Sequence, residues 1–238
     1  LSLDMGTGTQ NGNLFAKKGL SVAIKDRLTV QSKHGGRADV ESLGKLQFSG
    51  PGQLLNQGEI SAKEDFQITT STLANSGKII SQESTGHITA DTYRNTNIIA
   101  AREGLTVEAS QSLTDTGMLH STKTVKVMGA GTGSLGGAME GDEGVEITSL
   151  PGKMWDAVAT ETAQITSPKT VLIHGVNAFT SAGKVVAAEV TIAGTPNVTN
   201  RGLLSAKKMH LRNGSDLVNE KDIQAENEIE IASWKIGR

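Results

Sequence analysis

The chain has 238 residues, a formal net charge of -2, 28 glycines, 4 prolines, no cysteine and 3% aromatic residues. This composition excludes a disulfide framework, and no run approaches the ~20 apolar residues of a membrane-spanning helix. Without a basic tract or an excess of positive charge, we expect no nucleic-acid partner. Many glycines and few aromatic residues suit tight turns and a narrow interior better than a bulky globular core.

A period of about twenty residues runs through positions 54–127. Each round places an apolar residue, an asparagine or its substitute, a glycine, a second apolar residue and a small residue at alternate positions. In the first round these residues are Leu54, Asn56, Gly58, Ile60 and Ala62. A fixed period of this size is typical of a solenoid.

The register of Ile60 extends in both directions along the chain. It generates an apolar column of Leu14, Val40, Ile60, Ile79, Ile99, Leu119, Met139, Ile165, Val185, Leu204 and Ile223. Two positions later stand the small residues Ala16, Ser42, Ala62, Ser81, Ala101, Ser121, Gly141, Ser167, Ala187, Ala206 and Ala225. This second column was not used to set the register, so it is an independent check. A third column holds apolar pairs such as Phe66 and Ile68, and only the round after Ile79 departs from it, with Ile88 one place late.

Apolar and polar residues alternate within each round, which indicates strands with one buried face. The strands are too short to bury much surface in a hairpin meander, but a parallel coil stacks each strand on its equivalent one round away. The sequence therefore predicts an all-β fold, a right-handed parallel β-helix of about eleven coils. At the ~4.8 Å spacing of paired strands such a rod is roughly 50 Å long. We expect residues 1–238 to form this single elongated domain.

Two rounds are longer than the rest. Leu14 to Val40 and Met139 to Ile165 each span 26 positions, which predicts excursions near residues 23–39 and 149–164. The first excess is expected around residues 25–27 or 33–37, and the second carries residues 150–156. Because neither end shows a capping segment, we expect the natural protein to be longer.

One column at a turn contains mainly asparagine. Its members are Asn56, Asn75, Asn95, Asn200 and Asn219, with Asp115 as a substitute. Asparagine tolerates turn geometry and bonds to neighbouring backbone, so stacked turns predict a structural ladder of side chains.

A second turn column is charged. It contains Glu64, Glu83, Glu103 and Glu143, with Lys123 between the last two. Stacked carboxylates could bind a cation or act as an acid pair, as in polysaccharide-cleaving β-helix enzymes. Neighbouring cations such as Lys63 and Arg102 favour a solvated surface row of mixed sign.

Other motifs give no positive support for catalysis. Residues 131–136 spell the glycine pattern of a dinucleotide-binding turn, but no helix pattern follows. The five histidines have no metal-ligand spacing, and no Gly-x-Ser-x-Gly nucleophile elbow occurs. We therefore expect no catalytic residue, no cofactor and no metal site.

Trp155 is the candidate binding residue, together with its neighbours Met154 and Asp156 in the second excursion. An exposed tryptophan is a frequent anchor for a partner. The alternative is that Trp155 packs between the excursion and the rod, or covers an end.

The phrase Asn-x-Gly-x-Ile/Leu-x-Ala-x-x-x-Leu-x-Ile, present at residues 56–68 and nearly repeated at 200–211, resembles the filamentous haemagglutinin repeat. The resemblance covers most of residues 14–231. It implies a segment of a large exoprotein of a two-partner secretion system, such as an adhesin or a contact-dependent growth inhibition protein. Its partners would be an outer-membrane two-partner secretion transporter and a target-cell receptor or host surface. The location implied is secreted, or on the cell surface of a Gram-negative bacterium. The Asn-Pro-Asn type motifs of the family's secretion domain are absent, which favours an internal part of the rod.

The resulting hypothesis is a non-enzymatic extracellular rod that serves adhesion, receptor contact or display of a distal effector. The alternative is a carbohydrate-active β-helix enzyme, a polysaccharide lyase or hydrolase, in which acids from neighbouring coils converge. The acids considered for it are Asp26, Asp39, Glu64, Glu83 and Glu103. Ice or mineral binding by threonine rows is the weakest possibility, because Thr69, Thr70 and Thr72 do not recur in later rounds.

Overall fold

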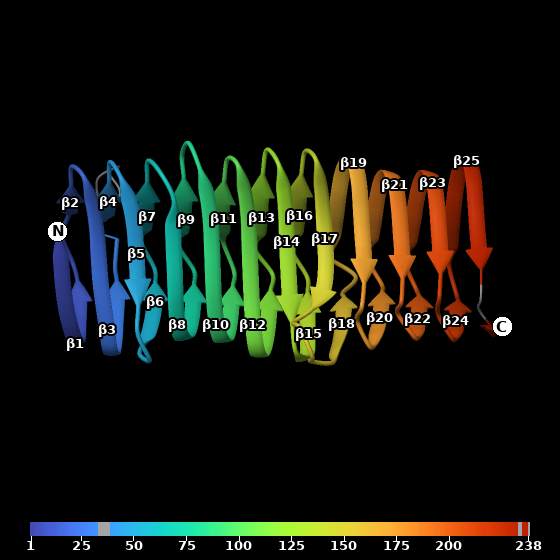
Figure 1. Ribbon diagram of the computed structural model, residues 1–238, viewed down its shortest axis with the longest axis horizontal. Helices are drawn as coiled ribbons and strands as arrows, with labels where there is room; N and C mark the ends of the chain where they lie inside the picture. Colours follow the sequence, from blue (N-terminus) through green and yellow to red (C-terminus); the bar gives the residue numbers. More distant parts are fainter. Residues whose placement is uncertain (33–38, 233–234, 238) are drawn as a thin grey trace.

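The computed structural model describes residues 1–32, 39–232 and 235–237, and for the last three only the backbone. These residues form 26 strands and no helix. The chain winds as a solenoid, with its two ends at opposite ends of the rod (Figure 1). Residues 33–37, one of the two places expected for the first excursion, lie outside the described residues.

Each coil has three faces. The first face carries the Ile60 column and consists of β2 (Leu14–Ala16), β4 (Val40–Ser42), β7 (Glu59–Ala62), β9 (Lys78–Ser81), β11 (Ile98–Ala101), β13 (Met118–Ser121) and β16 (Ala138–Gly141). It continues in the first halves of β19 (Gln164–His174), β21 (Lys184–Ala193), β23 (Leu203–Arg212) and β25 (Asp222–Ala232).

The second face follows the first along the chain. Three whole strands belong to it, β5 (Lys45–Ser49), β14 (Thr124–Gly129) and β17 (Gly144–Ser149). The first halves of five strands also belong to it, β1 (Ser2–Gln10), β3 (Gly19–Val30), β8 (Phe66–Asn75), β10 (Thr85–Asn95) and β12 (Gly104–Asp115). The second halves of β19, β21, β23 and β25 complete it. The third face consists of the second halves of β1, β3, β8, β10 and β12, and of β6 (Gln53–Asn56), β15 (Gly131–Leu135), β18 (Trp155–Ala159), β20 (Ala178–Ser181), β22 (Asn197–Asn200), β24 (Asp216–Asn219) and β26 (Lys235–Gly237).

The predicted register of the first face is confirmed from end to end. Every member of the Ile60 column pairs in parallel with the next, from Leu14 with Val40 to Leu204 with Ile223. The nine inner members are at most 1% exposed. The sequence thus predicted the all-β parallel coil and its core correctly. The right-handed sense of the coil stays a prediction from the usual handedness of parallel connections.

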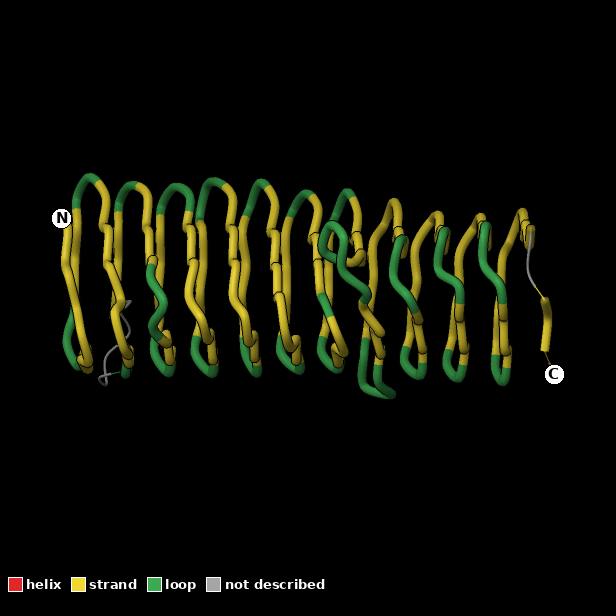
Figure 2. Tube along the Cα trace, turned by 60° about the horizontal axis from the view of Figure 1, so that its bottom comes forward, coloured by secondary structure: helices red, strands yellow, loops and turns green. Residues whose placement is uncertain are grey.

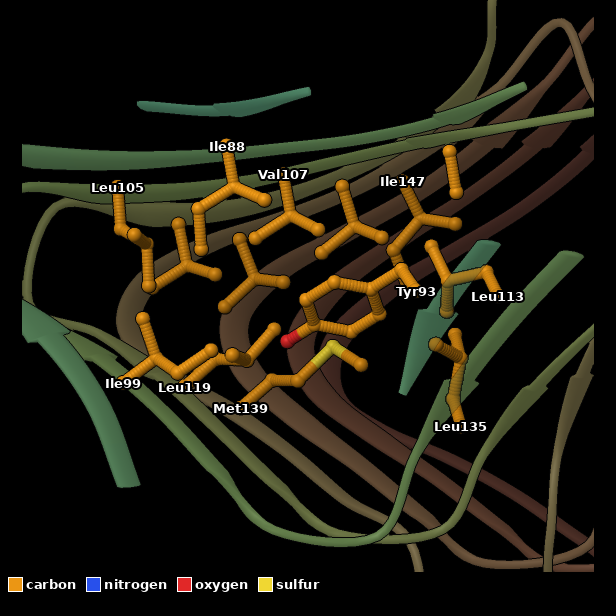
Figure 3. Packing of buried hydrophobic residues seen from close by; sticks show 14 of the residues in the cluster. Ile88, Tyr93, Ile99, Leu105, Val107, Leu113, Leu119, Leu135, Met139 and Ile147 are labelled. Carbon is orange, nitrogen blue, oxygen red and sulfur yellow. The ribbon is translucent and has the colours of Figure 1, made fainter. Parts of the chain in front are cut away.

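The core is a narrow cylinder in which like residues stack along the axis. In Figure 3 Ile88, Val107 and Ile147 line one side, and Ile99, Leu119 and Met139 line the opposite side. Tyr93 lies between these rows and is 1% exposed. Burial of these stacked side chains is the main favourable term for a fold without a globular centre.

Ile88 comes one place late along the chain, as the sequence indicates, because the corner between Ser81 and Gly86 has one residue more than the corner between Ala62 and Phe66, but it does not leave the column. Ile88 pairs with Ile68 and Val107, so it is in register. The exceptional residue is Gly86, which pairs with Phe66. A Cβ at Gly86 would lie 2.3 Å from Cζ of Phe66, so the phenyl ring fills the space that a side chain would occupy.

The pairing of the described strands locates the extra residues of the two long rounds along the chain, and in the second of these rounds the loop stands out from the coil (Figure 2). Val30 pairs with Asn56 and Val40 with Ile60, so the first excess lies between Val30 and Val40. Residues 25–27, the other place considered, belong to the continuous strand β3. In the second long round, four extra residues lie between Ser149 and Trp155 and two between Ala159 and Ile165.

The asparagine ladder is confirmed at the corner between the third and first faces. Asn56 Nδ2 donates to Asn75 Oδ1 at 2.7 Å, and Asn75 Nδ2 donates to Asn95 Oδ1 at 2.8 Å. Asn95 Nδ2 then donates to Asp115 Oδ2 at 3.1 Å. A second, shorter ladder joins Asn200 to Asn219 at 2.8 Å. The buried amides of the first ladder satisfy one another and fix the corners of the coils that carry them.

Between the two ladders the same column holds Leu135, Ala159 and Ser181. An amide at the position of Asp115 would therefore have no side-chain acceptor in the next coil, where Leu135 stands. Asp115 ends the first ladder with an acceptor-only side chain.

No helix long and apolar enough to cross a membrane occurs among the described residues.

Candidate functional site

The loop of residues 150–154 interrupts the even outline of the rod between the second and third faces. Lys153 N donates to Leu150 O at 2.9 Å, which closes a tight turn, and Gly152 has a positive φ of 70°. Gly131 N donates to Met154 O at 2.7 Å and ties the loop to the preceding coil. Met154 is 68% exposed, the highest value among the exposed large apolar side chains.

Trp155 lies inside the coil and is 0% exposed. Its indole occupies the space left by two glycines of the preceding coil. A Cβ at Gly129 would lie 2.5 Å from Trp155 Cε2, and one at Gly133 would lie 2.4 Å from Nε1. The structure therefore fits the packing interpretation, and the ring does not reach a partner at the surface.

The glycine pattern at residues 131–136 follows from the same contact. Gly131–Leu135 is strand β15, which pairs with β18 and is not followed by a helix. Gly133 leaves room for the indole of Trp155, and Gly131 adopts a φ of 71° at the corner. The pattern that spells a dinucleotide-binding turn thus has a packing explanation.

Asp156 points outward from the third face. Its Oδ1 accepts a hydrogen bond from Asn177 Nδ2 at 2.7 Å. Of the three candidate binding residues, the structure thus places Met154 and Asp156 at the surface and Trp155 in the core. Contact of this loop with a partner stays a prediction, and Met154 is its most exposed large apolar side chain.

The charged column at the corner between the first and second faces forms ion pairs along the rod. Lys63 Nζ lies 3.7 Å from Glu83 Oε1, and Lys123 Nζ lies 2.9 Å from Glu143 Oε1. Lys169 Nζ lies 3.7 Å from the same oxygen of Glu143. The bond from Lys123 holds the pKa of Glu143 below its ordinary value. The row is therefore a solvated one of mixed sign.

The five acids of the enzymatic alternative lie at three different corners. Glu64, Glu83 and Glu103 occupy the corner between the first and second faces, while Asp26 lies between the second and third. Asp39 lies between the third and first faces, where its Oδ2 accepts from Glu59 N at 2.9 Å. The coil therefore stacks Glu64, Glu83 and Glu103 in successive coils beside Lys63, but it keeps Asp26 and Asp39 at other corners, so the five acids do not share one site.

Among the described residues, one group has the composition of a metal site. His210, Glu228 and Glu230 place ligand atoms within 4.8 Å of one another on β23 and β25. Arg212 forms an ion pair with Glu230 and, with His210, holds the pKa of that carboxyl below its ordinary value. The arginine already supplies the positive charge that a metal ion would bring.

Asp115 and Tyr93 form a buried titratable pair at the end of the first ladder. Tyr93 Oη donates to Asp115 Oδ2 at 2.9 Å, and Gly117 N donates to Oδ1 at 3.1 Å. Burial raises the pKa of Asp115 to about 6, although the hydrogen bonds from Tyr93, Asn95 and Gly117 favour its charged form. Burial and then the charge of Asp115 raise the pKa of Tyr93 well above its ordinary value. The pair is structural, because both side chains point into the core.

The outer surface of the third face was missed by the sequence analysis. The register places Thr72, Thr92, Ser112 and Thr132 in one outward column. The expectation that Thr69, Thr70 and Thr72 do not recur in later rounds was therefore wrong for Thr72, whereas Thr70 pairs with Ala90 and does not recur. Listing the outward positions in the Ile60 register would have shown the column.

A stack of parallel coils with a continuous inward apolar column and ion pairs along its corners defines a β-solenoid rod. Residues 1–50, 27–92, 84–137 and 162–233 match the haemagglutinin repeat, and the chain belongs to the haemagglutinin repeat family. This confirms the resemblance to filamentous haemagglutinin-type segments. The matched segments leave out residues 138–161, which contain the loop and Trp155. No curated protein and no solved structure matches the chain.

Proposed function

We propose that this chain is a non-enzymatic, extracellular rod segment of a large secreted bacterial exoprotein. The rod serves adhesion, receptor contact or the display of a distal effector. The observation that carries the proposal is the unbroken inward column from Leu14 to Ile223, which makes each coil an equivalent spacer. A solenoid of this kind transmits extension because each repeat contacts only its neighbours.

Export by a two-partner secretion transporter of the outer membrane suits this construction. The chain would cross the membrane unfolded and then fold coil by coil at the surface of a Gram-negative bacterium. The absence of cysteine supports this route, since no disulfide would form before export. The family relationship supports an adhesin, or a protein of contact-dependent growth inhibition with a role in virulence.

The loop of residues 150–154 is the proposed contact with a target-cell receptor or host surface. It lies in the part of the chain that the family repeat does not match, and its Met154 offers an exposed apolar side chain. A loop that departs from the repeat of the rod suits recognition, because loops vary while the scaffold holds them in place.

Binding of the labelled, purified protein to epithelial and bacterial cells tests the proposal. We expect saturable binding that Met154→Ser weakens by severalfold. Leu43→Ser is the matched control, since Leu43 is also exposed (42%) but lies at another corner. Deletion of residues 152–156 is unsuitable as a test, because it removes the buried Trp155 together with the end of the loop.

Absence of saturable binding to any cell type would contradict an adhesive surface in this segment. Equal loss in the Met154 and Leu43 variants would exclude the loop as a specific contact. Depolymerisation of any member of a glycan and polyuronate panel would contradict the non-enzymatic assignment.

A further inference from the structure

Arg94 lies alone among uncharged neighbours on the outer surface of the third face. Along the rod it pairs with Ala74 on one side and Thr114 on the other. Thr92, two positions earlier on the same strand, belongs to the outward column of hydroxyl residues that runs from Thr72 to Thr132. Among the described residues the Arg94 guanidinium has no ion-pair or hydrogen-bond partner. Its charge and its planar set of donors are therefore available to a ligand.

A shallow depression of about 240 Å³ lies beside this arginine. Its floor and ends are Leu55, Ala74 and Arg94, which are equivalent positions of three successive coils. Leu55 and Arg94 stand two strand spacings, or about 9.6 Å, apart. Because Ala74 between them is small, the column has a notch with an apolar floor and a cation at one end.

The wall of the depression is the neighbouring corner, where Gln57, Ser76 and Thr96 follow the ladder residues. Ser76 Oγ donates to Asn56 O at 3.3 Å, and Thr96 Oγ1 donates to Asn75 O at 3.2 Å. Since each hydroxyl proton is used by the backbone, the oxygens of these two lining residues keep lone pairs that can accept from a ligand. Gln57 is exposed and adds an amide that can donate or accept.

The asparagine ladder holds this wall in place. Asn75 lines the depression and is 2% exposed, with bonds to Asn56 and Asn95. The corners that carry Gln57, Ser76 and Thr96 therefore keep one spacing and one orientation. A ligand need not order them on binding, which lowers the entropic cost of association.

We propose that this depression binds a carboxylated sugar residue of the uronic acid type. The paired N–H groups of Arg94 donate to the carboxylate. The C–H face of the ring packs on Leu55 and Ala74, and the ring hydroxyls donate to Ser76 and Thr96. Gln57 completes the polar contacts at the open side. This site would give the proposed adhesive function a ligand class, and its biological role rests on that function. Binding of the sugar itself is measurable on the isolated protein.

Titration of the isotope-labelled protein with matched sugars tests the site. Methyl glucuronide and methyl glucoside differ in the carboxylate alone, and acetate supplies the carboxylate without the ring. We expect methyl glucuronide to shift the amide resonances of Gln57, Ser76 and Thr96, with at least tenfold tighter binding than either of the other two probes. Arg94→Gln should weaken the binding of methyl glucuronide at least tenfold.

Two further variants make the test specific. Arg102→Gln removes an exposed arginine of the next corner and should leave the titration unchanged. Ala74→Leu fills the notch while keeping Arg94 and should abolish the shifts. The circular dichroism of all three variants should match the parent, because the changed side chains point outward.

Equal binding of acetate and methyl glucuronide would overturn the proposal and leave a simple anion site. The proposal would also be overturned if the two sugars bound equally or if neither bound. An Arg94→Gln titration identical to that of the parent would overturn it too. If methyl glucuronide does not bind but the protein still binds cells, the sugar site alone fails. If the sugar binds but no cell type does, the adhesive role fails and the sugar site stands.

Discussion

The coils before and after the loop of residues 150–154 share one core but break their strands at different corners. Before the loop, β3, β8, β10 and β12 run without interruption from the second face to the third. After it, β19, β21, β23 and β25 run without interruption from the first face to the second. The Ile60 column passes through both parts without a shift. Inward residues therefore set the coil, whereas corner residues decide where each strand bends and where it ends.

The corner residues explain the difference. After the loop, the break between the second and third faces uses Gly175, Gly194 and Asn213, which have φ values of 63°, 59° and 57°. These positions follow paired residues in three successive coils, so one left-handed turn is repeated. Glycine and asparagine are the residues that adopt this conformation at least cost. At the corresponding corner before the loop, strands such as β10 bend through a register shift near Ala90.

The largest effect is expected at the junction of the two parts. Trp155→Ala removes a fully buried indole that fills the space over Gly129 and Gly133, so we expect a loss of about 3–5 kcal/mol in the free energy of unfolding. Urea denaturation followed by circular dichroism measures it. Met154→Ala, one residue earlier and exposed, is the control and should change stability by less than about 0.5 kcal/mol. A similar small change for both would contradict the packing role of Trp155.

A second effect is a dependence of stability on pH in the part before the loop. The folded pKa of Asp115 is about 6, above its ordinary value of 3.8, so the folded state keeps this proton longer. The stabilisation of the folded state by protonated Asp115 is fully present below pH 3.8 and is lost as pH rises through 6. We expect a loss on the order of 3 kcal/mol across this window. Comparison of the unfolding free energies of the parent and Asp115→Asn at pH 4 and pH 7 isolates this change, and an equal fall in both proteins would refute it.

The two asparagine ladders should differ in the stability they give. Asn75→Ala breaks bonds to both neighbouring coils in the buried first ladder and should cost about 2–3 kcal/mol. Asn219→Ala, in the exposed end of the second ladder, should cost less than about 1 kcal/mol. Thermal unfolding of the two variants side by side measures the contrast. A larger loss at Asn219 would show that burial does not set the strength of a ladder.

The smallest effect concerns the corner that distinguishes the two parts. Gly194→Ala places a Cβ in the left-handed region and should cost about 1–2 kcal/mol. Asn213→Gly, at the equivalent position one coil later, should be close to neutral. Ala109→Gly, at the corresponding corner before the loop, should destabilise by about 0.5–1 kcal/mol, because no left-handed conformation is needed there. Stabilisation by Ala109→Gly would show that both parts use the same turn.

The sequence predicted the repeat well and the candidate site only in part. The spacing from Ile60 to Ile79 and Ile99 is visible along the chain because it repeats. The total excess of the second long round was also visible, but its division between two corners depends on how β18 pairs with β15. For Trp155 the sequence left a surface anchor and packing against the rod as alternatives, because its neighbours in sequence are loop residues. Its true neighbours are Gly129 and Gly133, which lie one coil away.

Alternation and period alone determined the coil, its register and its ladders, because a side chain one period away always becomes the neighbour one strand spacing along the axis. Only the tertiary structure decided that Trp155 turns inward, that the strands change corners after it, and that Ala74 opens a notch beside Arg94. These features depend on contacts between residues that differ from one coil to the next. Such contacts are set by loop length and side-chain volume, which do not follow the repeat.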